Sequence, residues 1–470
     1  MSTEPIPLPA TGVAKHEVIS WFVETRPKLC LLPWLNIHTN PDGKIKLCCN
    51  VHIDHFVHKH QKDENDNLIN FNLGYDNIDD IWKSRYMRSS RVAHHVNRGS
   101  GECQGCDSLE ETTGHSPRVG QNKLWEARSK EDTPIQEYLV EQLTGDIAHS
   151  HPTMLPISLE LRLGNQCNLQ CITCWGMSSS LIHDERKEII GSGVLDSKEM
   201  IWLKNKWTDD EHIVDRTDLK EWFDTDVFYS NFKKMAPTLR RLYTTGGEPT
   251  LIKSNYKMFQ MLIDAGNTDC RIEFTSNMTT WNPEFYKRVA QFKNVEIQMS
   301  IDGVDEVGEY IRYPSDFGKV RENIFKAAEL VSTRPGWTVK CFTVLQALNL
   351  QHIGPIWDLL KEACDQYSIN IDWWPITLSH PEYLSLKAVP YDIRHLAGAE
   401  LGDKRNEYIE DTSSFYIGHH TWDTLRDALE NANYDAELNS KLGQFIKLND
   451  EIRQSDGELI FSELIKQYHE

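Results

Sequence analysis

The sequence predicts an α/β protein, and three observations support this prediction. First, six short strand-like stretches follow one another between residues 157 and 375, separated by stretches with helical periodicity. Second, three of these strand candidates alternate apolar and polar residues, whereas parallel strands buried on both faces are usually continuous apolar runs. Third, the chain has 470 residues, enough for two or three domains and a large core. The strands are expected at Ile157–Leu163, Leu239–Thr245, Cys270–Asn277, Val295–Asp302, Thr338–Leu345 and Asn370–Pro375.

The polar face of these strands predicts a barrel with an open interior. If helices cover the outside, the alternating polar residues point inward, where a packed barrel would carry branched apolar side chains. We therefore expect a partial six-stranded (β/α)6 barrel that holds a ligand, with its active-site groups at the carboxyl ends of the strands. The interior residues are expected to be Glu160, Arg162, Glu273, Thr275, Gln298, Ser300, Lys340 and Asp372. Among them, Glu160, Lys340 and Asp372 are candidates for a catalytic role that the sequence does not define further.

The composition narrows the class of protein. Hydrophobic residues make up 39% and charged residues 26%, which is ordinary for a soluble globular protein. No apolar run is long enough to cross a membrane, and Met1 to Lys15 lack a signal-peptide core, so we expect a cytoplasmic protein without a membrane partner. The net charge of −20 disfavours a nucleic-acid partner, because phosphate backbones attract Lys and Arg. The 11 cysteines are expected to be metal ligands or reduced thiols rather than disulfides.

Three cysteines, Cys167, Cys171 and Cys174, share one short loop after the first expected strand. Cysteine thiolates hold iron–sulfur clusters, and three ligands leave one iron of a four-iron cluster open. The C-x3-C-x2-C pattern resembles the signature of the radical SAM superfamily, although Thr173 stands where that family usually has an aromatic residue. The stretch Tyr243–Pro249 resembles the GGEP motif of the same family. The alternatives are a zinc loop, which favours pairs of C-x2-C, or three unrelated thiols.

The radical SAM resemblance implies a cofactor, a reaction and a set of ligand residues. In that family the open iron holds the amino and carboxylate groups of S-adenosylmethionine, and an electron from the cluster splits the sulfonium to a 5′-deoxyadenosyl radical. Carried onto this sequence, Gly246 and Gly247 allow close backbone approach, and Glu248 helps to fix the ammonium. Arg312 is expected to pair with the carboxylate, its alternative role being a surface ion pair. The remaining expected contacts are Thr275, Asn277, Ser300 and Asp302 for ribose and carboxylate, and Thr343 to Leu345 for adenine.

A second cysteine set, at Cys30, Cys48, Cys103 and Cys106, precedes the expected barrel. The turn Asn40–Gly43 between two alternating stretches predicts a hairpin that brings Cys30 near Cys48. This spacing resembles the twitch module, the short form of the SPASM domain, which holds an auxiliary four-iron cluster in that family. There the module usually follows the radical SAM core, whereas here it precedes it. The alternatives are a four-cysteine zinc ribbon, and Cys49 in place of Cys48, which we favour because it fits the Gly-x4-Cys spacing.

These motifs predict five regions along the chain. The radical SAM resemblance does not extend into the last of them. The regions are a lead-in at 1–29, a twitch/SPASM-like module at 30–110, a linker at 111–155 with one helix near residues 135–142, a radical SAM core at 156–375 with an insertion at about 181–235, and a mostly helical region at 376–470.

Three functions are compatible with the motifs. The first is a radical SAM enzyme that modifies a ribosomally made peptide, with two [4Fe-4S] clusters, S-adenosylmethionine and a reducing flavodoxin or ferredoxin system. The second is an oxidase or epimerase of a small molecule such as a sugar or aminocyclitol. The third is a non-catalytic iron–sulfur protein in electron transfer, against which the intact cysteine loop and GGEP motif argue.

Overall fold

The computed structural model describes residues 12–51, 61–145, 154–208, 219, 221–410, 415–416 and 419–465. The chain forms two compact units: the first consists of Met1–Gly164, Leu219–Tyr243 and Lys257–Cys270, and the second of Asn165–Asp218, Thr244–Tyr256 and Arg271–Glu470. Helices and parallel strands occur in both units, which confirms the predicted mixed α/β class. The domain limits expected from the sequence stay a prediction.

All six expected strands are present, and their ends lie within two residues of the prediction. The alternating and apolar stretches therefore located the strands correctly, because side-chain period two is a local property of the sequence. The strands are β3 (Ser158–Arg162), β4 (Arg241–Thr245), β5 (Arg271–Ser276), β6 (Val295–Ser300), β7 (Trp337–Leu345) and β8 (Ile371–Thr377).

The first unit contains the expected hairpin, formed by β1 (Asn36–Thr39) and β2 (Ile45–Lys46). The sequence did not indicate that β1 also pairs with β3 in parallel, with Ile37 opposite Leu159. The other elements of this unit are α1 (Lys15–Thr25), α2 (Leu32–Leu35), α3 (Ile78–Lys83), α4 (Arg85–His95), η1 (Gly101–Cys103), α5 (Gln104–Thr113), α6 (Pro117–Glu131), α7 (Thr133–Thr144), η4 (Trp222–Asp224) and α10 (Asp226–Met235), while α11 (Lys253–Asp264) crosses the limit between the units.

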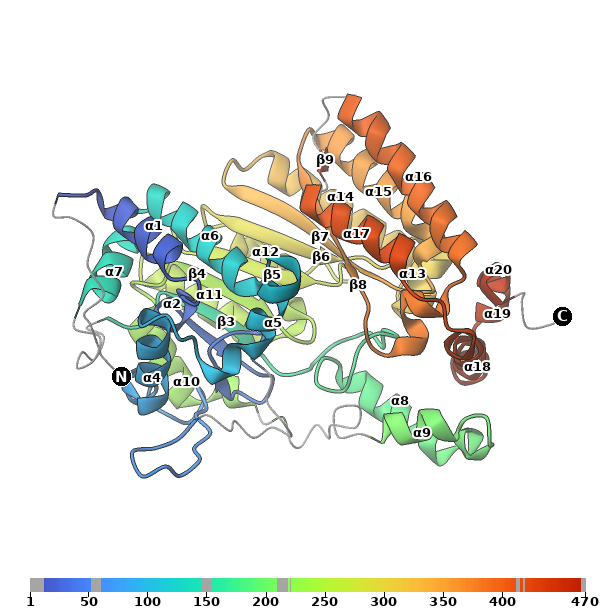
Figure 1. Ribbon diagram of the computed structural model, residues 1–470, viewed down its shortest axis with the longest axis horizontal. Helices are drawn as coiled ribbons and strands as arrows, with labels where there is room; N and C mark the ends of the chain where they lie inside the picture. Colours follow the sequence, from blue (N-terminus) through green and yellow to red (C-terminus); the bar gives the residue numbers. More distant parts are fainter. Residues whose placement is uncertain are drawn as a thin grey trace. The chain divides into compact units, whose positions relative to one another are not determined.

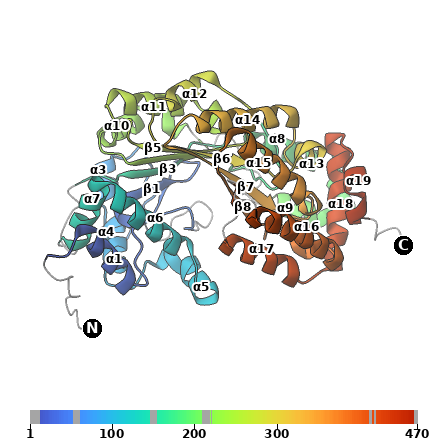
Figure 2. The ribbon, with the colours of Figure 1, turned by 90° about the horizontal axis from the view of Figure 1, so that it is seen from above.

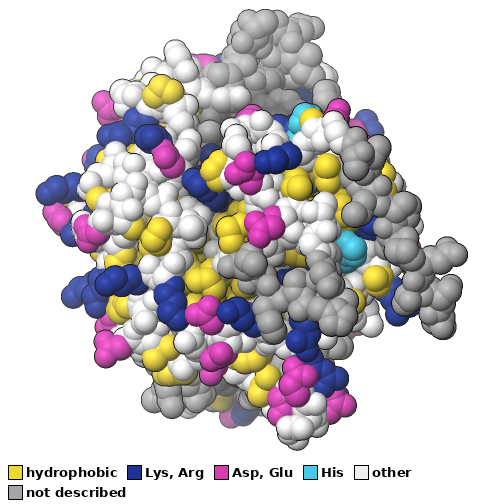
Figure 3. Space-filling model, turned by 90° about the vertical axis from the view of Figure 1, so that its left-hand side faces the viewer, with side chains coloured by type: hydrophobic (Ala, Val, Ile, Leu, Met, Phe, Trp, Pro, Cys, Tyr) yellow, Lys and Arg dark blue, Asp and Glu magenta, His cyan; other side chains and the backbone are white. Residues whose placement is uncertain are grey.

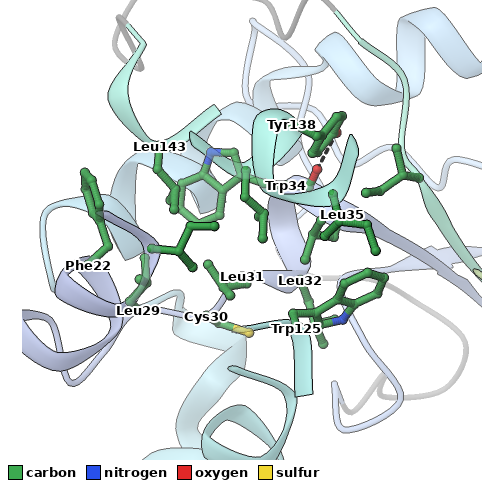
Figure 4. Close-up of a cluster of buried hydrophobic side chains, with 14 of the residues drawn as sticks. Phe22, Leu29, Cys30, Leu31, Leu32, Trp34, Leu35, Trp125, Tyr138 and Leu143 are labelled. Carbon is green, nitrogen blue, oxygen red and sulfur yellow. Dashed lines mark hydrogen bonds between the residues drawn. The ribbon is translucent and has the colours of Figure 1, made fainter. Parts of the chain in front are cut away.

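The expectation of a single helix near residues 135–142 is wrong, because α5 and α6 also form. Ser116 caps α6 by accepting a hydrogen bond from the Val119 amide at 3.2 Å, and Pro117 occupies the first turn. Few apolar residues mark α6, which explains why periodicity missed it. Its Trp125 is nevertheless buried in one cluster with residues of α1, α2 and α7, such as Phe22, Trp34 and Tyr138 (Figure 4). Within that cluster the Tyr138 hydroxyl donates to the Trp34 carbonyl at 2.6 Å.

The second unit is built on the parallel strands β5, β6, β7 and β8, to which β9 (Phe415–Tyr416) is added. The register places Thr275 opposite Gln298, Gln298 opposite Lys340, and Lys340 opposite Asp372. The polar residues of successive strands therefore share one face, as the alternation predicted, and Thr275 Oγ1 bonds Gln298 Oε1 at 2.9 Å.

At least one helix lies in the chain between each of these parallel strands and the next, because parallel neighbours need a crossover connection. Helix α14 packs on β7, α15 lies between α14 and α16, and α17 contacts β8 (Figures 1 and 2). The predicted helical character of the region after residue 375 is confirmed. The helices and 3-10 turns of this unit are α8 (Ser180–Gly191), η2 (Val194–Asp196), α9 (Ile201–Trp207), η5 (Pro249–Leu251), α12 (Pro283–Val289), α13 (Asp305–Ile311), α14 (Phe317–Ser332), η6 (Leu350–His352), α15 (Ile353–Tyr367), η7 (Glu382–Leu384), η8 (Leu386–Ala388), α16 (Tyr391–Glu410), α17 (His419–Asn431), α18 (Ala436–Arg453), α19 (Gly457–Ile460) and α20 (Ser462–Ile465).

The described surface carries both signs of charge. On the face drawn in Figure 3, Lys and Arg side chains are interspersed with Asp and Glu side chains. Among the described helices, none is long and apolar enough to cross a bilayer.

Candidate active site

The cysteine loop is closed by hydrogen bonds at its two ends. Asn165 is buried; its side-chain amide donates to the Gly176 carbonyl at 2.7 Å, and its own carbonyl accepts from the Ser180 amide at 2.8 Å. Ser179 Oγ donates to the Leu169 carbonyl at 2.6 Å. The loop that carries the three cysteines is thus fixed by its own side-chain and backbone hydrogen bonds.

Two further backbone bonds tie this loop to the segment after α13. The amide of Gln170 donates to the Tyr313 carbonyl at 2.5 Å, and the amide of Ile172 donates to the Ile311 carbonyl at 2.9 Å. Cys171 stands between these two bonds and is 5% exposed. The bonds therefore fix the backbone on both sides of Cys171.

The three thiols lie in one electrostatic neighbourhood. Burial raises the pKa of Cys167 to about 12, and the neighbouring Cys171 adds to this shift. Cys171 and Cys174 share a hydrogen bond, which lowers the pKa of Cys171 and raises the pKa of Cys174. The positive charge of Arg312 lowers the pKa of both thiols. Because only thiolates bind iron, a cation beside them favours the ligand form.

Gly246 and Gly247 of the GGEP stretch form a turn that lies directly against the cysteine loop. Both have positive φ, +85° and +56°, and a Cβ atom on Gly247 would stand 2.1 Å from the Gln166 carbonyl oxygen. The next amide, that of Glu248, donates to the same carbonyl at 2.8 Å. Position 247 therefore needs glycine for contact between protein backbones, a reason that the sequence alone did not supply.

Glu248 is buried, and both oxygens of its carboxylate accept hydrogen bonds from the protein. Oε1 accepts from Thr250 N, Thr250 Oγ1 and Ser276 Oγ at 3.2, 2.7 and 3.1 Å, and Oε2 accepts from Asn277 N at 2.8 Å. Burial raises the pKa of Glu248, while these donors lower it. The carboxylate joins the GGEP turn to the end of β5. Its expected contact with the S-adenosylmethionine ammonium stays a prediction.

Asn277, expected to contact the ligand, lies beside the first cysteine. Its Nδ2 atom is 3.9 Å from Cys167 Sγ and 3.0 Å from Asn168 Oδ1. Its Oδ1 accepts from both the amide and the hydroxyl of Thr279, at 3.0 and 2.6 Å. The end of β5 thus meets the cysteine loop at Cys167, and a weak N–H···S bond there would stabilise a thiolate.

Arg312 and Asp302, both expected to bind ligand, pair with each other. Arg312 Nη2 lies 2.7 Å from Asp302 Oδ2, and the two side chains are 15% and 1% exposed. Arg312 does form an ion pair, but the pair is almost fully buried. The alternative of an ion pair on the surface is therefore wrong. Asp302 Oδ1 also accepts from the Val344 amide at 2.7 Å, and Arg312 Nε is buried without a partner among the described residues. That donor remains available for a ligand.

The remaining expected contacts are at the ends of β6 and β7. The Thr343 hydroxyl donates to the Ile301 carbonyl at 2.7 Å and accepts from Trp373 Nε1 at 2.9 Å, so its side chain already has partners. Leu345 is fully buried, whereas Ser300 is partly exposed. Their roles toward ribose and adenine stay predictions.

The three candidates for a catalytic role occur in both units. In the second unit, Lys340 Nζ lies 3.2 Å from Glu296 Oε2, and burial raises the pKa of Asp372. In the first unit, burial raises the pKa of Glu160, but His38, at 3.1 Å, and two arginines lower it to about 2. Lys340 is thus ion-paired with Glu296, and Glu160 already has His38 as a partner within the first unit.

The second cysteine set gathers within the first unit. The thiols of Cys30, Cys48, Cys103 and Cys106 act on one another's charge, and burial, the largest cause, raises the pKa of Cys30 to about 12 and that of Cys103 to about 11. Cys48 interacts with Cys30 and Cys103, whereas the charged neighbours of Cys49 are Glu160, Arg162 and Lys46. This arrangement favours Cys48 over Cys49 as the member of the set.

Sequence reasoning missed His94, a buried residue of α4 in the same neighbourhood. Its Nδ1 lies 2.7 Å from the Lys28 carbonyl, which fixes the proton on that nitrogen, and its Nε2 lies 3.6 Å from Cys103 Sγ. Burial lowers the pKa of His94 to about 4. The signal was present in the sequence: Tyr86, Met87, Ser90, Arg91 and His94 are the buried residues of α4 at helical spacing.

Among the described residues, no group of three or more His, Cys, Asp or Glu side chains is arranged to hold a metal ion. A four-iron cluster requires a wider arrangement than a single ion, because each thiolate binds a different iron. A cysteine set can therefore hold such a cluster if its thiols lie near one another. The thiols of each set do so, since they act on one another's charge.

The cysteine loop, the glycine turn against it and the parallel strands define a domain of the radical SAM class. Residues 161–360 match the family model of the Radical SAM superfamily, so the chain contains a radical SAM domain. Thr173 and Trp175, where the motif departs from its usual form, lie inside the matched range.

The chain is similar to one curated protein and to two solved structures of another protein. The chain is 25% identical over 205 residues to the sporulation killing factor maturation protein SkfB of Bacillus subtilis (strain 168), a match that covers 40% of each protein. The structure of Streptococcus suis SuiB bound to S-adenosylmethionine is similar at 11% identity and a TM-score of 0.34, over 70% of this chain and 65% of SuiB. The complex of SuiB with its precursor peptide SuiA gives 10% identity and the same TM-score and coverage.

Proposed function

We propose that this chain is a radical SAM enzyme in which Cys167, Cys171 and Cys174 bind a four-iron cluster. The observation that carries the proposal is the cysteine loop held against the Gly246–Gly247 turn, inside the range that matches the Radical SAM superfamily model. When bound, the cluster supplies the electron that splits S-adenosylmethionine and so starts hydrogen abstraction from the substrate.

The protein's own contribution is to position the ligands and the reacting groups. Gly247 lets the glycine turn approach the Gln166 carbonyl, and Glu248 fixes that turn to the end of β5. Arg312 brings a buried positive charge to Cys171 and Cys174, and its Nε donor, which has no partner in the described part of the chain, is available for the ligand. Lys340 and Asp372, on the polar face of β7 and β8, are candidates for contact with the substrate.

The substrate that we propose is a ribosomally made peptide. The curated relative, which is 25% identical over 205 residues, is a maturation protein for a sporulation killing factor. A flavodoxin or ferredoxin system is the proposed source of the electron.

Anaerobic incubation with S-adenosylmethionine and a chemical reductant tests the proposed reaction. We expect 5′-deoxyadenosine to form, and its yield to rise when the correct precursor peptide is added, because substrate binding couples cleavage to hydrogen abstraction. Mass spectrometry of the peptide would show the modification. A protein that is loaded with iron yet forms no 5′-deoxyadenosine would contradict the proposal, and stimulation by a sugar or aminocyclitol instead would identify a small-molecule enzyme.

We further propose that Cys30, Cys48, Cys103 and Cys106 bind an auxiliary four-iron cluster that takes part in electron transfer. The supporting observation is that the four thiols share one neighbourhood. Asn122 of α6 holds the backbone around Cys30 on both sides: its Nδ2 donates to the Leu29 carbonyl at 2.8 Å, and its Oδ1 accepts from the Leu31 amide at 3.0 Å. The cysteine is thereby positioned by packing that does not depend on a metal.

Counting metal atoms tests the auxiliary cluster. We expect about eight iron atoms per chain after anaerobic reconstitution, and about four in the variant with Cys167, Cys171 and Cys174 all changed to alanine. That variant should keep broad visible absorption, which zinc cannot give because it is d¹⁰ and redox-silent. One zinc and no iron in the triple variant would show that the first unit holds a structural zinc site instead.

A further inference from the structure

The last residue of α18, Arg453, reaches the cysteine loop from the far end of the chain. Its Nη2 donates to the Gln170 carbonyl at 2.6 Å, and Gln170 directly precedes Cys171. Its side chain is 3% exposed, and the guanidinium lies 5.0 Å from the centre of the Tyr313 ring. Since the Gln170 amide is bound to Tyr313, both backbone polar groups of Gln170 have protein partners.

Arg453 belongs to a buried group of three charges. Its Nε and Nη2 lie 3.1 Å from the two carboxylate oxygens of Glu185, and Glu185 also pairs with Arg186 Nη1 at 2.9 Å. All three residues are buried, and Arg186 packs over Trp207 at 4.1 Å. One carboxylate thus faces two guanidinium groups, which leaves a net positive charge in the interior.

A buried net charge is costly unless a counter-charge is near. Asp450, one turn earlier on α18, faces the following turn, where it accepts from Ser455 Oγ and the amides of Gly457 and Glu458 at 2.8, 2.8 and 2.9 Å. Asp302 is already paired with Arg312. Cys171, a proposed cluster ligand, directly follows Gln170, so a bound cluster would bring negative charge next to this buried group.

We propose that Arg453 is a positioning residue of the cluster site. It holds the backbone next to Cys171, and its buried positive charge stabilises the reduced state of the cluster, which carries one more negative charge than the oxidised state. This inference rests on the proposed cluster at Cys167, Cys171 and Cys174. It gives the C-terminal helical region, which the sequence left unassigned, a role in electron delivery.

An EPR-monitored redox titration of the reconstituted chain tests the charge effect. Arg453→Gln should favour the oxidised cluster about tenfold, which is a shift of about 59 mV to lower potential for a one-electron couple. Glu185→Gln should shift the potential in the opposite direction, since it leaves the two arginines unopposed. Arg453→Lys should stay nearer to the wild-type value than Arg453→Gln, because it keeps the positive charge while losing the bidentate pair with Glu185. The EPR signal that changes when S-adenosylmethionine is added belongs to the cluster with the open iron.

The matched control is Arg426→Gln, which removes an arginine of α17 whose side chain is 56% exposed. It should leave the potential and the iron content unchanged, because solvent screens its charge. An Arg453→Gln protein with full iron and the control's potential would overturn the inference. If Arg453→Gln binds too little iron, Glu185→Gln decides: a shift to higher potential supports the inference, and an unchanged potential overturns it. Absence of a cluster from the Cys167 loop of the wild type would instead overturn the proposed function.

Discussion

Replacing Cys167, Cys171 or Cys174 by alanine is expected to abolish the formation of 5′-deoxyadenosine. Each thiolate would bind a different iron, so the loss of any one removes a ligand that no neighbouring side chain replaces. We expect the product to fall to the level of a reaction without protein, and the iron content of the variants to fall by about four atoms per chain. Product is measured by liquid chromatography after anaerobic incubation with S-adenosylmethionine and reductant.

Cys341→Ala and Cys364→Ala provide matched controls. Both cysteines are fully buried, on β7 and α15, and burial raises the pKa of each to about 12, as expected for inert core thiols. Their loss creates small cavities and should lower stability while preserving the iron content and the product. Wild-type product formation by any of the three loop variants would be incompatible with the assigned cluster ligands.

Gly247→Ala is expected to reduce S-adenosylmethionine cleavage at least about 100-fold. The new Cβ would stand 2.1 Å from the Gln166 carbonyl oxygen and 2.7 Å from its carbon. Neither is the end of a flexible side chain, so the glycine turn or the cysteine loop must move, and a displacement of about 1 Å at a reacting site can cost about 100-fold in rate. The assay is the same, with iron content measured in parallel.

Gly266→Ala is the control that separates this clash from backbone strain. Gly266 also has a positive φ, +73°, but its Cβ would meet no atom within 4 Å. Both variants incur the cost of placing alanine in the left-handed region, roughly 1–2 kcal/mol, and only Gly247→Ala disturbs the site. Equal activity of the two variants would show that contact between the glycine turn and the cysteine loop does not matter for the reaction.

Much of the fold follows from local sequence. The strands β3 to β8 were predicted because alternating or apolar stretches of five to nine residues are a property of neighbouring positions. Helix α6 was missed because its buried Trp125 and Asn122 are surrounded by polar residues, and its stability comes from packing on α1 and α7. The pairing of β1 with β3 could not be predicted either, since about 120 residues separate the two strands and neither carries a signal for its partner.

The candidate site also has a part that the sequence predicts and a part that only the structure shows. The cysteines of the loop and the GGEP stretch are contiguous motifs, and their spacing identifies them without a structure. The sequence was a poorer guide to the roles of the single residues around these motifs. Glu248 and Thr343 have side chains already bonded to the protein, and Arg312 is paired with Asp302; no motif in the sequence marks these partners.

The sequence by itself indicated the class of domain, the proposed cluster ligands and the positions of the strands along the chain, since all of these depend on short, continuous stretches. Only the tertiary structure decided why Gly247 must be glycine, that His94 lies at Cys103, and that Arg453 holds a loop 283 positions earlier in the chain. The physical reason is that these contacts join residues with no common periodicity. They form only when packing of the core has fixed the elements that carry them.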